Sequence, residues 1–248
     1  MSTGRVFSAV QVVKTYGFGE TSVRALGQVS VGFESGRFTA IKGPSGSGKS
    51  TLMHCLAGLD TITSGQIWVG GTELSTLSDR DLTRPRRDRI GFIFQAFNLV
   101  PHLSALKNIT LPLALTGRPH GPGLMDHLVG VPGIGGRLSH GSAELSGGQQ
   151  QRVAIVRGLI SRPAVVFADE PTGNLDSRSS DEVLSLLQSL TMDRGQTTVM
   201  VTHDGATAAC AHRAVLLSDN RVVNDIPAPS VASVVAAMAG LRGASSPR

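Results

Sequence analysis

Short apolar runs alternate with segments of helical periodicity along most of the 248-residue chain. A short apolar run bounded by turn residues is typical of a strand, whereas an apolar stripe that repeats with each helical turn is typical of a helix. The predicted strands cover residues 6–13, 29–33, 38–42, 66–69, 90–94, 164–168 and 197–202, with a closing pair at 213–217 and 222–225. The predicted helices cover residues 49–59, 146–160 and 179–190. This alternation favours an α/β fold.

The pattern changes between residues 95 and 143, where strand signals stop and glycine becomes frequent. Prolines break this stretch into short pieces, at Pro101, Pro112, Pro119, Pro122 and Pro132. We therefore predict a small, mainly helical subdomain at 95–143, inserted into an α/β core of residues 1–94 and 144–226. Residues 227–248 are rich in Ala, Ser, Pro and Gly, which predicts a tail with a short helix at 231–241 and disorder at its end.

The composition, with 40% apolar and 17% charged residues, is typical of a globular protein of one domain. A net charge of +5 would suit a polyanionic partner. However, one Trp and one Tyr provide few aromatic platforms for stacking on nucleic-acid bases. The arginine cluster at 84–89 is interrupted by Asp88 and is interpreted as a solvated face, so we predict no nucleic-acid partner. That cluster consists of Arg84, Arg86, Arg87 and Arg89.

Cys55 and Cys210 form no disulfide framework, which fits a reducing cytoplasm. Cys55 lies in an apolar helical run and is interpreted as a small buried hydrophobic residue. Residues 1–11 lack the basic and apolar regions of a signal peptide, and no run approaches the ~20 apolar residues of a membrane span. If the protein acts at a membrane, we expect another chain to cross it.

The segment Gly-Pro-Ser-Gly-Ser-Gly-Lys-Ser at 43–50 matches the P-loop pattern, follows a predicted strand and opens a predicted helix. Its glycines let the backbone point N–H groups at phosphate oxygens. Lys49 is predicted to contact the β- and γ-phosphates, and the Ser50 hydroxyl to coordinate Mg²⁺. The alternative is a plain glycine-rich turn. The predicted phosphate-binding residues are Gly43, Pro44, Ser45, Gly46, Ser47, Gly48, Lys49, Ser50 and Thr51.

Two acids follow the apolar strand at 164–168 directly. Because the carboxyl ends of parallel strands form the site edge in α/β folds, Asp169 is predicted to hold Mg²⁺ and Glu170 to polarise the attacking water. A solubilising strand-end pair is the alternative, and the neighbouring P-loop argues against it.

A second helix opens with glycines at Leu-Ser-Gly-Gly-Gln, residues 145–149. A serine and two glycines at a helix start can cradle phosphate, although a simple N-cap is the alternative. Because the P-loop already serves one nucleotide, a second cradle must serve another ligand or the nucleotide of another copy. Its residues are Ser146, Gly147, Gly148 and Gln149.

These three motifs, in this order and spacing, resemble the ABC ATPase family over nearly the whole chain. The resemblance implies a P-loop NTPase (RecA-like) core with an N-terminal antiparallel β subdomain and an inserted helical subdomain. It also implies ATP and Mg²⁺ as ligands. In that family, two subunits form a head-to-tail homodimer, and each ATP lies between the P-loop of one copy and the signature at 145–149 of the other.

Further roles follow from the resemblance. Tyr16 corresponds to the aromatic residue that stacks on adenine, and Gln95 to the glutamine that senses Mg²⁺ and the γ-phosphate. His203 corresponds to the histidine that contacts the γ-phosphate, and Asp176 to the residue that reaches across the dimer. The implied catalytic set is Glu170, His203, Gln95 and Lys49, and the implied metal set is Ser50, Gln95 and Asp169. The remaining histidines are interpreted as structural: His54, His102, His120, His127, His140 and His212.

The segments 94–101, 106–109 and 168–177 resemble the MacB/LolD group of this family. This implies an ATP-hydrolysing motor subunit, peripheral on the inner face of the plasma membrane, that drives a separate permease of the FtsX/MacB type. Such systems serve export, lipoprotein release or mechanotransmission. The apolar loop at 95–103 is predicted to be the permease docking groove. One departure is the stretch 117–140, which carries more Gly and Pro than the group implies and leaves the helix before the signature weak.

Other functions remain open at this stage. A soluble ABC ATPase of translation would carry two ATP domains per chain, one of DNA repair would carry a long coiled coil, and a cell-division ATPase would share the same fold. A small-molecule kinase with a P-loop would need neither the signature nor the loop at 174–176. A neighbouring gene for a permease would distinguish these possibilities.

Overall fold

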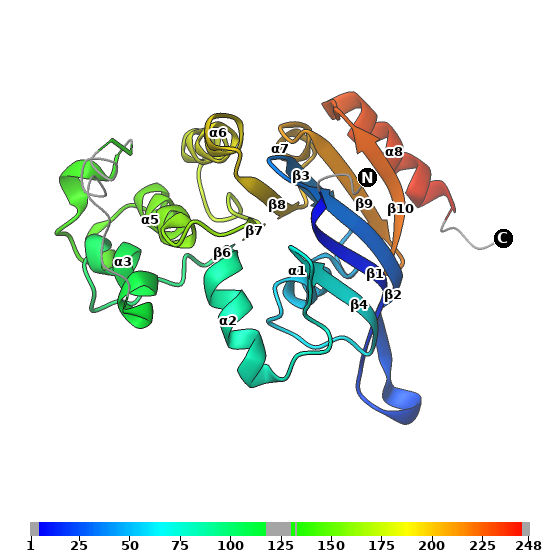
Figure 1. Ribbon diagram of the computed structural model, residues 1–248. Helices are drawn as coiled ribbons and strands as arrows, with labels where there is room; N and C mark the ends of the chain where they lie inside the picture. The colour runs from blue at the N-terminus through cyan, green and yellow to red at the C-terminus, as the bar shows by residue number, and fades with distance from the viewer. Residues whose placement is uncertain (1–4, 118–129, 132, 245–248) are drawn as a thin grey trace.

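The computed structural model describes residues 5–117, 130–131 and 133–244. Its central sheet has six strands, and only its edge pair is antiparallel (Figure 1). Their order across the sheet is β10 (Arg221–Pro227), β9 (Arg213–Ser218), β3 (Phe38–Lys42), β8 (Thr197–Thr202), β7 (Val165–Asp169) and β6 (Ile90–Ile93). The predicted α/β fold is thereby confirmed.

The register of the parallel strands brings their carboxyl ends to one edge. Every residue of β3 and β8 is buried, as expected for parallel strands with both faces covered. Lys42 pairs with Thr202, and Asp169 pairs with Val201. Each of these strands is therefore followed by a loop that opens at the same edge.

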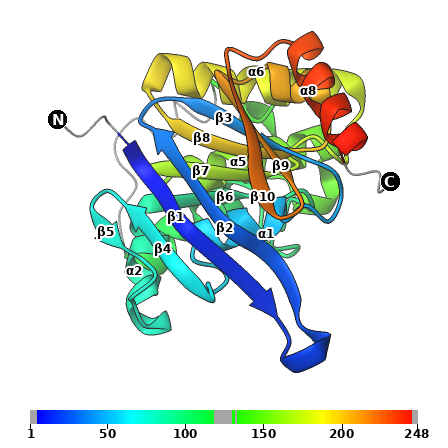
Figure 2. The same cartoon turned by 90° about the vertical axis from the view of Figure 1, so that its right-hand side faces the viewer.

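The N-terminal sheet is antiparallel, as the family resemblance implies. Its order is β2 (Val23–Glu34), β1 (Arg5–Tyr16), β4 (Ser64–Val69) and β5 (Thr72–Glu73). β1 and β2 are longer than predicted and form a hairpin whose tip contains the 3-10 turn η1 (Gly19–Thr21). This tip projects beyond both sheets (Figure 2).

Helices cover the central sheet on both faces. Helix α1 (Lys49–Leu56) lies between the two sheets in a core that includes Phe7, Leu26 and Phe167. It ends before the predicted residue 59 because Gly58 turns the chain with a φ of +66°. The other face is covered by α6 (Ser177–Arg194), α7 (Gly205–Ala209) and α8 (Val231–Ala244).

The helical subdomain lies at the end of the molecule opposite α8 (Figure 1). Its elements are α3 (Ala105–Thr116), η2 (Gly135–Arg137) and η3 (Ser142–Glu144), and they pack against α5 (Gly147–Leu159), which also contributes Ile155 to the core of the central sheet. Ile109 and Val153 belong to the core between α3 and α5. The prediction that Pro112 breaks the chain is wrong: α3 continues through it, because packing of α3 on α5 outweighs the hydrogen bond that the proline removes and the clash of its ring. Much of the Gly- and Pro-rich stretch, 118–129 and 132, lies outside the described residues.

Helix α2 (Asp79–Arg89) has no predicted counterpart. The interpretation of its arginines as a solvated face holds for Arg84 and Arg87, which are exposed. Arg86 and Arg89 are only partly exposed, and Arg89 donates to the carbonyl of Val69 at 3.0 Å. The predicted helix of the tail is confirmed as α8, whose Val234 is fully buried. Residues 245–248, for which we predicted disorder, lie outside the described residues.

Candidate functional site

Four segments with candidate residues meet at the carboxyl edge of the central sheet. The loop 43–48 follows β3, Gln95 follows β6, Glu170 follows β7 and His203 follows β8. The parallel pairing of these four strands places the segments side by side. This is the edge at which α/β folds bind ligands.

At two positions of the loop from β3 to α1, only glycine fits. A Cβ on Gly43 would lie 2.2 Å from the carbonyl oxygen of Leu217, and one on Gly48 would lie 2.3 Å from that of Ala25. Gly48 also has a φ of +91°, which disfavours other residues. The backbone therefore curls tightly into the N-terminus of α1, where N–H groups and the helix dipole favour an anion.

Lys49 and Ser50 lie in the first turn of α1. Nζ of Lys49 donates to the carbonyl of Pro44 at 2.8 Å, so the ammonium lies inside the loop curl. Burial lowers the pKa of Lys49, while the carboxylates of Glu170 and Asp169 act in the opposite direction. Oγ of Ser50 donates to Oδ1 of Asp169 at 3.4 Å. The loop and the strand-end acid therefore belong to one site.

The donor set of this site suits Mg²⁺ bound to phosphates. Ser50 contributes a hydroxyl and Asp169 a carboxylate, and Mg²⁺ commonly binds few protein oxygens when phosphates and waters complete its shell. Burial raises the pKa of Asp169, and Nε2 of His54 lies 3.8 Å from its Oδ2. His54 had been interpreted as structural, because nothing in the sequence places the face of α1 against β7.

Glu170 and His203 form the second polar pair of the site. Nδ1 of His203 lies 2.9 Å from Oε2 of Glu170. Glu170 adopts a left-handed φ of +43°, and its N–H donates to the carbonyl of Val201. Such a conformation is strained for a residue with a side chain and is typical of functional sites. This backbone conformation directs the Glu170 carboxylate toward the His203 imidazole. An imidazole can accept or donate a proton.

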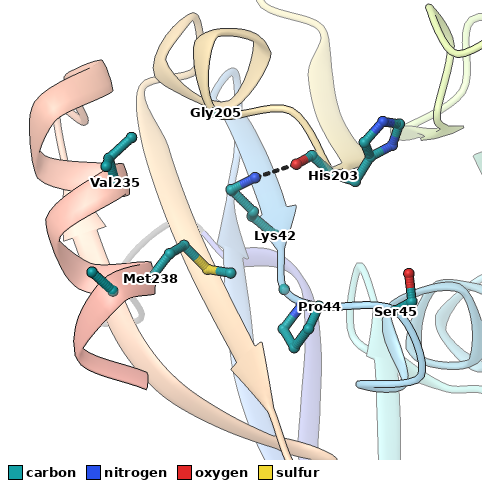
Figure 3. A pocket seen from close by; sticks show the side chains of 9 residues that line it. Lys42, Pro44, Ser45, His203, Gly205, Val235 and Met238 are labelled. Atoms are coloured by element: carbon teal, nitrogen blue, oxygen red, sulfur yellow. Dashed lines mark hydrogen bonds between the residues drawn. The ribbon is translucent and has the colours of Figure 1, made fainter. Parts of the chain in front are cut away.

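A pocket of about 500 Å³ lies beside this pair, between the loop 43–45 and α8 (Figure 3). Val235 and Met238 of α8 form its apolar wall. Nζ of Lys42 donates to the carbonyl of His203 and so ties β3 to the loop that carries the imidazole. Burial lowers the pKa of Lys42. Nothing in the sequence marks Lys42, which stands there only as the last residue of a predicted strand.

Gln95 lies against the loop that follows Glu170. A Cβ on Gly173 would lie 2.7 Å from Nε2 of Gln95, and Nδ2 of Asn174 donates to the Gln95 carbonyl at 3.1 Å. The next turn, at Phe97 and Asn98, has two consecutive positive φ angles.

Arg157 of α5 holds this turn. Its Nη2 donates to the carbonyl of Phe97 at 2.8 Å, and its Nη1 to that of Asn98 at 2.6 Å. The guanidinium therefore connects the helix of the signature motif to the loop of Gln95. No sequence pattern identifies this arginine, since its partners are backbone carbonyls about 60 residues away along the chain.

The signature motif opens α5 with a capping box. Oγ of Ser146 accepts from the N–H of Gln149 at 3.3 Å, and Oε1 of Gln149 accepts from the N–H of Ser146 at 3.0 Å. Asp176 caps α6 by accepting from the N–H of Ser179 at 2.8 Å. Within the described residues, no hydrogen bond or ion pair joins Ser146 or Gln149 to the P-loop. Ser146 is exposed at the start of α5, whereas Gly148 is buried against Ser179.

Tyr16 ends β1 and is 43% exposed. Its hydroxyl donates to Oδ2 of Asp60 at 2.6 Å.

In the part of the chain that the structure describes, no helix is both long and apolar enough to cross a bilayer.

Residues 26–173 match the ABC transporter family. MacB of Bdellovibrio bacteriovorus, a macrolide export ATP-binding/permease protein, is 45% identical over 212 residues, which are 86% of this chain and 32% of that protein. The uncharacterized ABC transporter ATP-binding protein MJ0796 of Methanocaldococcus jannaschii is 42% identical over 217 residues, 85% of this chain and 92% of that protein. The chain spans about a third of the length of the MacB relatives.

The solved structures agree with this assignment. A dimeric, post-hydrolysis state of MJ0796 bound to ADP and Pi matches with a TM-score of 0.80 at 38% identity, and covers 90% of this chain and 99% of that one. The family match spans the P-loop, the signature motif and the strand-end acids. The chain therefore belongs to the ABC transporter family, as one of its ATP-hydrolysing ATP-binding cassettes.

Proposed function

We propose that this chain is the motor subunit of a membrane transport complex, which binds ATP with Mg²⁺ as a homodimer and drives a separate permease of the FtsX/MacB type. The observation that carries the proposal is the convergence of Lys49, the Ser50–Asp169 pair and the Glu170–His203 pair at one sheet edge. The similarity to the MacB proteins, whose name joins an ATP-binding part to a permease, supports the partner.

Each residue has a role in this proposal. The P-loop backbone and Lys49 bind the β- and γ-phosphates, and Ser50, Asp169 and Gln95 hold the metal. Mg²⁺ supplies positive charge that stabilises the phosphate oxygens during transfer. Glu170 polarises the attacking water and accepts its proton, and His203 contacts the γ-phosphate.

The signature motif acts on the nucleotide of a second copy. Gly147 and Gly148 present N–H groups at the start of α5, and in one chain Ser146 and Gln149 have no hydrogen bond to the P-loop. In a head-to-tail homodimer, the signature motif of each copy contacts the nucleotide bound at the P-loop of the other copy. Asp176 then lies near the nucleotide site of the partner. The dimeric structures of MJ0796 are consistent with such an assembly.

The permease docks on the apolar loop after Gln95, at the inner face of the plasma membrane. Leu99 packs partly on the core of the helical subdomain, whereas Val100 is 37% exposed and Leu115 of α3 is 78% exposed. Phe97 is only partly buried and lies in the turn that Arg157 holds. Apolar side chains in such a turn suit an amphipathic cytoplasmic helix of the partner. Movement of this turn on ATP binding transmits force to the permease.

The test is affinity capture of the tagged full chain from membranes, followed by identification of the associated chain. A polytopic permease is expected with the natural sequence, and it should be lost with a Phe97→Asp, Leu99→Asp double variant whose fold and basal ATP hydrolysis persist. Met192→Asp, at an exposed apolar residue of α6, is the matched control and should retain the partner. Full capture by the folded double variant would reject this docking surface. Loss of its fold would assign Phe97 and Leu99 to the core.

A further inference from the structure

Tyr16 is fixed at its hydroxyl end by an acid from another element. It is the only tyrosine of the chain and ends β1. The hairpin tip that follows projects from the molecule (Figure 2), and its Phe18 is 93% exposed. Its hydroxyl donates to Oδ2 of Asp60 at 2.6 Å. Asp60 lies just beyond α1, and its N–H donates to the carbonyl of His54 in that helix. The phenol is therefore connected to the helix that begins with the P-loop residues.

A buried lysine completes the arrangement. Nζ of Lys14 donates to Oδ1 of Asp60 and to the carbonyl of Thr61, both at 2.7 Å, and lies 4.6 Å from the centroid of the Tyr16 ring. Lys14 is only 7% exposed. A cation at this distance from an aromatic centroid attracts the ring. Lys14 therefore fixes one face of the ring and Asp60 fixes its hydroxyl.

The protonation states suit these roles. Burial alone would raise the pKa of Asp60, but hydrogen bonds from Lys14, Tyr16 and the Thr61 N–H hold it below its ordinary value. Burial and the hydrogen bond to Asp60 raise the pKa of Tyr16. At neutral pH, Asp60 is therefore an ionised acceptor and Tyr16 a protonated donor.

We infer that Lys14 and Asp60 are positioning residues for the nucleotide base: they hold the partly exposed Tyr16 ring at a set place relative to the P-loop. The inference rests on the proposed function, in which Tyr16 stacks on adenine. A ring fixed before binding loses little side-chain freedom when a base stacks on it. The connection of Asp60 to α1 sets the distance between the base platform and the phosphate cradle.

A purely structural role for the pair predicts different behaviour. Lys14 and Asp60 also join β1 to the loop after α1, so their loss would lower stability in any case. A structural defect would weaken the binding of every P-loop ligand alike. A positioning defect affects only ligands that carry a base.

The experiment compares MgATP with Mg²⁺-tripolyphosphate, which has the phosphates but no base, by calorimetry on the full chain. Asp60→Asn and Lys14→Met should each raise the dissociation constant for ATP about fivefold to tenfold, because the Tyr16 ring is then no longer held in place before the base stacks on it. Binding of tripolyphosphate should be unchanged, and the loss in turnover should appear in KM rather than kcat. Glu20→Gln, which removes a carboxylate at the exposed hairpin tip, is the control for charge and should change neither ligand.

A second readout follows from the single tyrosine. Phenolate absorbance during a pH titration reports on Tyr16 alone, and Asp60→Asn should move its midpoint to lower pH while Glu20→Gln leaves it in place. The losses from Asp60→Asn and Tyr16→Phe should not add, because both remove the same hydrogen bond. If Asp60→Asn does not fold, Lys14→Met provides the ligand comparison.

Equal weakening of ATP and tripolyphosphate, or no change in ATP affinity in folded variants, would overturn the inference. These outcomes differ from failure of the proposed function. If the natural chain bound neither ligand, the phosphate site would be rejected. If it bound both equally tightly, the base role of Tyr16 would be rejected.

Discussion

Nδ1 of His203 lies 2.9 Å from Oε2 of Glu170, although 33 residues separate them along the chain. The two residues follow adjacent parallel strands, β7 and β8, whose register pairs Asp169 with Val201. A carboxylate beside the imidazole orients it, and the imidazole in turn limits the rotation of the carboxylate. The pair thus combines the proposed water-activating base with the proposed γ-phosphate contact.

Glu170→Gln should retain ATP binding and lose most turnover. The amide keeps the shape of the side chain but accepts no proton, so hydrolysis should fall by about 10²–10⁴-fold. Phosphate release measures the rate, and size-exclusion chromatography with ATP should show a trapped dimer. Hydrolysis near the natural rate would mean that another group activates the water.

His203→Ala should slow hydrolysis less than Glu170→Gln does. It removes one hydrogen bond to a charged group, which corresponds to a loss of about tenfold to a hundredfold. Steady-state kinetics at saturating ATP measures the effect. His102→Ala, at an exposed histidine of the helical subdomain, is the control. A rate equal to that of the control would remove His203 from the site.

Lys49→Ala should weaken ATP binding by about tenfold to a hundredfold, because a charge-assisted contact to phosphate is lost. Calorimetry with MgATP measures this change. Lys107→Ala removes an exposed lysine of α3 and serves as the control. Unchanged affinity in a folded Lys49→Ala variant would contradict the P-loop assignment.

Activity should require two copies with complementary sites. Ser146→Arg blocks the signature motif, and Lys49→Ala disables the P-loop. A mixed dimer of the two variants contains one intact P-loop facing one intact signature, so mixing two inactive proteins should restore part of the hydrolysis. If mixed dimers form and remain inactive, the head-to-tail arrangement is incorrect.

Cys55 should be unreactive in the native protein. Burial raises the pKa of its thiol to about 12, so almost no thiolate is present at neutral pH. Mass spectrometry after brief alkylation should find Cys55 unmodified in the folded chain and modified after denaturation. Native-state modification that matches the denatured rate would show that the core around α1 opens readily.

Local chemistry made much of the chain predictable. The strands at 38–42 and 197–202 were predicted with the bounds that the structure has, because buried parallel strands are continuous apolar runs. Helix α2 was not predicted, since Leu82 is its only non-proline apolar side chain and the helix depends on the Ser78 cap and on contacts such as Arg89 to Val69. The continuation of α3 through Pro112 likewise depends on contacts distant in sequence, because packing of α3 on α5 outweighs the local cost of the proline.

The motifs of the candidate nucleotide site can be read along the chain, since the P-loop, the strand-end acids and the signature each consist of consecutive residues. Which of their side chains meet follows from the fold alone. The contacts of His54 with Asp169, Lys42 with His203 and Asp60 with Tyr16 join separate elements. They depend on strand register and on the face that each helix turns toward the sheet, and no local pattern of residues encodes these long-range choices.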